Sequence, residues 1–218
     1  MYKFFLLFCL LYTSAIYAGE WSLQKQTNNI DIYQQENKET YATTKGTTKI
    51  AVPLEALIAV LDDETACKQW VFNCLEREKV KIISPNTKIE RFVTKFPYPL
   101  KNRELYSLIK TQLNNKSQNK IVTIHMTAQD GYTSKPNMIL IKNFDAKWIF
   151  EEVDTTSTKV TYEVYSDPLV LNFVPIATIN KEMVKNVYYT LNNLSKIVTK
   201  PQYLNKKFTK EEIKNIVR

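Results

Sequence analysis

The chain has 218 residues and a formal net charge of +8, with 44% hydrophobic and 24% charged residues. These fractions are those of an ordinary globular protein and exclude a largely disordered chain. The three glycines form neither GxGxxG nor GxxxxGK[ST], which excludes the glycine-rich nucleotide-binding loops. The positive balance favours an anionic partner.

Residues 1–18 show the three-part pattern of a secretory signal peptide. Lys3 gives a positive start, Phe4–Leu11 is an unbroken apolar run, and small residues lead to a predicted cleavage site after Ala18. This run is too short to span a bilayer. A buried first strand is the alternative. We expect an exported, monomeric protein, periplasmic or secreted, whose anionic partner is a membrane surface reached transiently rather than nucleic acid.

Cleavage would remove Cys9 and leave Cys67 and Cys74. An even number of cysteines in an oxidising compartment predicts a disulfide. Seven residues of straight helix would separate the Cα atoms by roughly 10.5 Å, too far to bridge. The pair can therefore close only if the helix ends between them, and two buried thiols are the alternative.

The first elements of the mature chain are short strands followed by a helix. Strands are predicted at Trp21–Gln26 and Ile30–Gln35, with a Thr-Asn-Asn turn between them. Thr-rich strand sequence continues over Glu39–Val52, where Gly46 interrupts it. Pro53 suits a first helical position, and the apolar spacing from Leu54 predicts a helix to Gln69.

After Cys74 the apolar period falls towards two, which predicts a long antiparallel meander with mostly hairpin connections. The predicted strands are Val80–Ser84, Thr87–Lys95, Glu104–Leu113, Lys120–Ala128, Asn137–Ile141, Lys147–Glu152 and Lys159–Ser166.

From Pro175 apolar residues recur every three or four positions for some twenty residues, which predicts a long amphipathic helix. In the basic segment 199–218, Thr209 and Glu212 form a capping box for a short helix to Val217. Together these elements predict an α+β helix-grip domain over residues 19–198. In this fold a curved antiparallel sheet wraps a long C-terminal helix and encloses a hydrophobic cavity.

Four segments in this order resemble START (StAR-related lipid-transfer) domains, particularly bacterial exported members. They are Cys67–Cys74 at a helix end, the Pro-rich turn Phe96–Glu104 with its Arg-Glu ending, the strand Ala146–Phe150, and the strand and turn Lys159–Pro168. The resemblance extends from Trp21 to about Val198.

This resemblance implies a lipid- or sterol-binding tunnel, with ligand entering beneath the C-terminal helix and no cofactor. Some family members carry a buried acidic–basic pair in the tunnel. By spacing from Arg103, Glu90 falls at the acidic position, but the basic position is Ile109. The pair is therefore expected to be incomplete.

Strand parity turns Trp148 and Phe150 inward, because Lys147, Ile149 and Glu151 share the other face. Plain core is the alternative to a cavity wall for every such residue. The predicted cavity-lining residues are Glu90, Phe92, Ile109, Trp148, Phe150, Tyr162, Val164, Met183, Val187 and Leu191.

The connection between the last strand and the long helix is unusually apolar. Leu169, Leu171 and Phe173 lie between two prolines, where a surface connection would be polar. They are predicted to form a membrane-contacting lid, or alternatively to plug the core. The START resemblance implies that Lys116 and Lys120 lie in a neighbouring loop, where they are expected to hold anionic head groups.

Catalysis has little support in the sequence. His125 is the only histidine and alternates with apolar residues in a strand, and Arg103 is expected to pair a carboxylate or tie its turn to backbone carbonyls. The predicted function is non-enzymatic lipid binding, with lipid transfer as its extension. A cavity enzyme would need Glu90, His125 or a tyrosine within hydrogen-bonding range in the cavity. A protein-interaction module is the third hypothesis.

Overall fold

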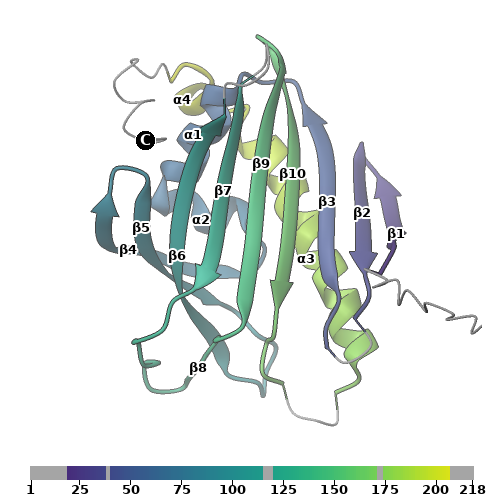
Figure 1. Ribbon diagram of the computed structural model, residues 1–218, viewed down its shortest axis with the longest axis vertical. Coiled ribbons are helices and arrows are strands. Elements are labelled where there is room, and N and C mark those ends of the chain that lie inside the picture. The colour runs from purple at the N-terminus through teal and green to yellow at the C-terminus, as the bar shows by residue number, and fades with distance from the viewer. Residues whose placement is uncertain (1–18, 38–39, 115–119, 171–173, 207–218) are drawn as a thin grey trace, which may run out of the picture.

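One curved sheet carries the architecture, and helix α3 (Ile176–Ile197) packs across its inner face (Figure 1). The structure is a computed structural model that describes residues 19–37, 40–114, 120–170 and 174–206. The predicted signal peptide, the helix after Thr209, and Lys116, Leu171 and Phe173 lie outside these ranges. In the described residues the predicted α+β helix-grip fold is present.

Within those ranges the sheet has ten strands in the order β1-β2-β3-β10-β9-β7-β6-β5-β4, with β8 beside β6. All neighbours are antiparallel except β6 and β8, which pair in parallel through Asn102–Glu104. The strands are β1 Trp21–Thr27, β2 Ile30–Gln35, β3 Thr43–Ile50, β4 Cys74–Ser84, β5 Thr87–Thr94, β6 Asn102–Asn114, β7 Ile121–Ala128, β8 Met138–Leu140, β9 Phe144–Asp154 and β10 Ser157–Ser166.

The interruption expected at Gly46 is wrong, because β3 continues through it. Its role is close packing against α3. A Cβ atom built on Gly46 would lie 2.4 Å from Leu191 Cδ1 and 2.6 Å from Val187 Cγ1. Glycine therefore allows the long helix to approach the middle of the sheet.

The single helix predicted from Leu54 to Gln69 is in fact broken at Asp63. It consists of α1 (Leu54–Asp62), the 3₁₀ turn η1 (Glu64–Ala66) and α2 (Cys67–Trp70). Asp63 has an extended backbone, and its carboxylate accepts hydrogen bonds from the N–H groups of Thr65 and Ala66. It is therefore the N-cap of a new turn rather than an interior helical residue.

This break makes the predicted disulfide possible. Helix α2 ends at Trp70, and Asn73 turns the chain with a φ of 61°. Cys67 and Cys74 are joined by a disulfide, with Cα atoms 6.0 Å apart. The bond joins the first residue of α2 to the first residue of β4.

The C-terminal half of α3 is buried in the main core, whereas its first turns are half-exposed. Beyond it, α4 (Pro201–Leu204) packs near α1, and the buried Tyr203 donates a hydrogen bond to Asp63 at 2.8 Å. The domain bounds of 19–198 and 199–218 stay predictions. Of the helices in the described ranges, none has the length and apolarity needed to cross a membrane.

Candidate functional site

A cavity of about 250 Å³ lies between the inner face of the sheet and the three helices α1, α2 and α3. Its wall is supplied by β4, β5, β6, β7, β9 and β10 on one side and by the helices on the other. Along β6 the lining residues extend from Arg103 to Thr111, which is about 26 Å at the usual strand rise. The lining of the cavity therefore extends along most of β6 and across six neighbouring strands.

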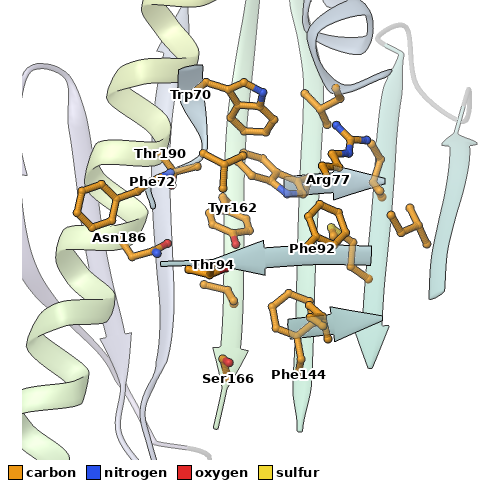
Figure 2. A pocket seen from close by; sticks show the side chains of 18 of the residues that line it. Trp70, Phe72, Arg77, Phe92, Thr94, Phe144, Tyr162, Ser166, Asn186 and Thr190 are labelled. Carbon is orange, nitrogen blue, oxygen red and sulfur yellow. Dashed lines mark hydrogen bonds between the residues drawn. The ribbon is translucent and has the colours of Figure 1, made fainter. Parts of the chain in front are cut away.

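Apolar side chains form most of the cavity wall, and several of them are aromatic (Figure 2). Trp148 stacks on Tyr162 with ring centroids 3.9 Å apart, and Trp70 meets Trp148 edge to face at 5.8 Å. Phe92 and Phe144 line the cavity from β5 and β9. Such a wall binds apolar groups by removing their surface from water.

The structure places six of the ten predicted lining residues on the cavity wall. They are Phe92, Ile109, Trp148, Tyr162, Val164 and Met183. Phe150, Val187 and Leu191 point inward as expected but belong to the solid core and do not line the cavity. Strand parity and helix periodicity predicted the correct face. Val187 and Leu191 pack on Gly46, so protein fills the inner face there.

Glu90 also does not line the cavity, because two basic side chains cover it. Its carboxylate accepts hydrogen bonds from Arg77 Nε at 2.8 Å and Nη2 at 3.2 Å, and Lys88 Nζ lies 2.8 Å away. Glu90 is fully buried, while Arg77 and Lys88 line the cavity. The basic partner missing at Ile109 is thus supplied by β4 and β5.

Sequence reasoning missed Arg77 and Lys88 as site residues. A signal existed for Lys88, which stands two residues before Glu90 and so shares its strand face. For Arg77 the signal required the pairing register, which puts Arg77 opposite Phe92 on the next strand.

Tyr162 presents a hydroxyl group to the middle of the cavity, near Thr94 and Asn186 (Figure 2). That hydroxyl makes no hydrogen bond with any residue in the described ranges. Burial raises the pKa of Tyr162 above its ordinary value of 10.0, so the phenol stays neutral and able to donate at physiological pH.

Arg103 lines the cavity at the start of β6 and links the turn before β6 to the segment after β10. Its guanidinium donates to the carbonyl oxygens of Pro168 at 2.6 Å, Leu169 at 3.4 Å and Lys101, and it lies 4.0 Å from the ring centroid of Phe96. This is the backbone tie expected from the sequence. Burial lowers the pKa of Arg103 from its ordinary value.

Only part of the predicted lid region is described. Leu169 follows β10 with a 40% exposed side chain and a φ of 49°. The expectation that Lys120 lies nearby is wrong. Ile121, which follows Lys120, pairs with Glu151 of β9, and Glu151 pairs with Lys159 of β10. Ser166, the residue of β10 at the start of the lid region, is seven residues further along that strand. The two regions are about 23 Å apart along the strands.

Lys120 instead pairs with Glu55 and Glu152, with N–O distances of 3.6 Å to each.

His125 lies on the outer face of β7, opposite to the lining residues Ile124 and Met126, with Nε2 2.9 Å from Asp145 Oδ2. It therefore lies outside the cavity. In the part of the chain that the structure describes, no three His, Cys, Asp or Glu side chains could hold a metal ion together.

A helix-grip domain with a largely apolar cavity between sheet and helices defines a class of proteins that hold small hydrophobic molecules. The family model described as START domain matches residues 15–169. The chain belongs to the START domain family, as its sequence motifs indicated, and family membership points to binding of a lipid or other hydrophobic ligand. A search of curated proteins gives no match.

Solved structures show the same fold at low sequence identity. A STAR-related lipid transfer protein fragment from Xanthomonas axonopodis is 19% identical, with a TM-score of 0.73 over 83% of this chain and 99% of that chain. Human STARD10 is 20% identical, with a TM-score of 0.72 over 83% and 74% of the two chains. Human StAR-related lipid transfer protein 5 is 14% identical, with a TM-score of 0.69 over 86% and 89%.

Proposed function

We propose that this protein is exported and binds a lipid or another hydrophobic small molecule in the cavity, reversibly and without converting it. The observation that carries the proposal is the largely apolar cavity beneath α3, in a chain of the START family. Lipid transfer between membranes is the activity we assign to it. The disulfide between Cys67 and Cys74 supports export, because such bonds persist in oxidising compartments.

The polar groups of the described cavity support binding rather than catalysis. Glu90 is occupied by two cations, and Arg103 by backbone carbonyls. Tyr162 faces the cavity, but no carboxylate or histidine is bonded to it that could act as its partner base. These groups can bind and orient a ligand; a general acid–base pair would require a second titratable group at hydrogen-bonding distance.

Intrinsic fluorescence offers a direct test of cavity binding. Two of the three tryptophans, Trp70 and Trp148, line the cavity, and the third is Trp21 in β1. A lipid brominated on its acyl chain should quench Trp70 and Trp148 with saturating, stoichiometric behaviour. The variant Trp21→Phe should retain this quenching in full.

Transfer is tested separately with vesicles. Purified mature protein should move a fluorescent lipid from donor to acceptor vesicles, and mass spectrometry should recover the lipid unchanged. We expect transfer to need anionic lipid and to weaken with salt, because the chain is strongly basic and ions screen its attraction to the surface. A covalent product would favour the cavity-enzyme hypothesis. The absence of both quenching and transfer would favour the interaction module.

A further inference from the structure

We propose that the cavity selects a single-chain amphiphile with an anionic head, a carboxylate or a phosphate monoester, and binds that head at Arg77 and Lys88. The inference rests on the proposed function and names the ligand class for the same cavity. Among the described lining residues, Arg77, Lys88 and Arg103 are basic, and Asp62 is the one acidic residue.

The cluster at Arg77 contains two cations and two carboxylates, and only one of the carboxylates, that of Glu90, is buried. Two cations share the single buried carboxylate of Glu90. Asp62 Oδ1 lies 3.4 Å from Lys88 Nζ, but the Asp62 side chain is 62% exposed and water weakens its attraction. One of the two positive charges is therefore compensated only by a carboxylate that water screens.

The donors of this cluster are also incompletely used. Arg77 binds Glu90 through Nε and Nη2, and its Nη1 group has no hydrogen-bond partner in the described ranges. The guanidinium reaches the cavity beside Phe92, as Figure 2 shows. An anionic oxygen at this position would accept a hydrogen bond from Nη1 and also compensate the positive charge that only Asp62 balances. A neutral head group could accept the hydrogen bond but could not compensate the charge.

The dimensions of the cavity select one chain. Its volume of about 250 Å³ is below the roughly 300–1,000 Å³ typical of small-molecule sites. It nevertheless extends for about 26 Å along β6, from Arg103 to Thr111. A volume this small suits one acyl chain and leaves too little space for a lipid with two chains side by side.

The test compares heads on an identical chain. Dodecanoate, dodecyl phosphate and dodecan-1-ol are titrated against the full mature protein, with tryptophan fluorescence or displacement of a bound fluorophore as the readout. We expect the two anions to bind at least tenfold more tightly than the alcohol, since hydrogen bonds to charged groups are the stronger ones. Within the carboxylates, affinity should rise roughly fourfold per added methylene until the cavity is full.

Lys88→Met is the informative variant, because it leaves Glu90 paired with Arg77 and should fold. It should reduce the preference for anions at least fivefold while leaving the affinity for dodecan-1-ol within twofold of the parent. Lys88→Gln, which keeps a polar end group on the side chain, should behave like Lys88→Met. The matched control is Lys110→Met, which removes the same charge from the exposed face of β6 and should change neither affinity.

The outcomes separate the two proposals. Tighter binding of either anion supports the inference and identifies which head is the natural one. Equal affinity for the alcohol and both anions overturns the inference but leaves the proposed function intact. Failure of all three probes to bind contradicts the proposed function itself. An unchanged preference in both Lys88 variants, with folding verified by circular dichroism, would also overturn the site.

Discussion

Arg103 donates a hydrogen bond from Nε to the carbonyl oxygen of Pro168 at 2.6 Å, across 65 residues of sequence. The same guanidinium also binds the carbonyl oxygens of Lys101 and Leu169. It therefore connects the turn before β6 to the segment after β10, at one end of the cavity. The planar guanidinium with its several N–H groups matters here as much as the charge, because three carbonyl oxygens in different directions need several fixed donors.

We expect Arg103→Gln and Arg103→Lys each to lower the free energy of unfolding by about 1–3 kcal/mol, because carbonyl groups lose their donors in a buried setting. Urea unfolding at neutral pH measures this effect. Lys101→Gln is the control, since only the backbone of Lys101 takes part. A lysine variant as stable as the parent would show that charge alone, without the planar guanidinium, is sufficient.

Two tyrosines provide a matched comparison of hydroxyl groups. The Tyr162 hydroxyl makes no hydrogen bond in the described structure, whereas the Tyr188 hydroxyl accepts one from Asn28 Nδ2 at 2.9 Å. Tyr162→Phe should leave the unfolding free energy of the empty protein unchanged or slightly raised. Tyr188→Phe should lower it by about 1 kcal/mol. The reverse order in denaturant unfolding would contradict the assignment of Tyr162 as an unpaired cavity group.

The disulfide should contribute measurably to stability. Replacing both Cys67 and Cys74 by serine should lower the free energy of unfolding by about 2–3 kcal/mol, as expected for cross-linking so short a loop. A thiol assay on the unreduced, denatured mature protein should find no free thiol. Two reactive thiols would show that the bond does not form in the protein as produced.

Glu64 connects η1 to β4 and should make stability depend on acid pH. Its carboxylate lies 2.8 Å from Lys79 Nζ and accepts a hydrogen bond from the Lys79 backbone N–H at 3.0 Å. The bonds from Lys79 hold the pKa of Glu64 below its ordinary value of 4.5. Since the folded-state pKa is lowered, the stabilisation is present above pH 4.5 and is lost as the pH falls through the folded value.

Unfolding free energies of the parent and of Glu64→Gln should therefore converge as the pH is lowered from 7 to 3. Glu20→Gln removes one exposed carboxylate near the N-terminal strand and serves as the control for net charge. A difference between the parent and Glu64→Gln that stays constant over this range would show that Glu64 acts through packing rather than through its charge.

Much of the fold was predictable from periodicity, because the alternation of apolar residues along a strand reports which face is buried. The strands Ile30–Gln35 and Lys159–Ser166 were predicted to within about two residues. The break at Asp63 was missed. A capping carboxylate competes with helix continuation, and apolar spacing alone does not register that competition.

For the cavity, the sequence alone determined which face of each strand is buried and which family the chain resembles. The tertiary structure decided which of the buried residues line the cavity and which charged residues pair. Trp148 and Phe150 have the same parity, yet Trp148 lines the cavity and Phe150 is solid core. The difference depends on how the helices pack across the inner face of the sheet, where α3 contacts β2 and β3 and α1 contacts β9. Likewise, no local pattern pairs Arg77 with Glu90: strand register brings them together, and register is a property of the assembled sheet.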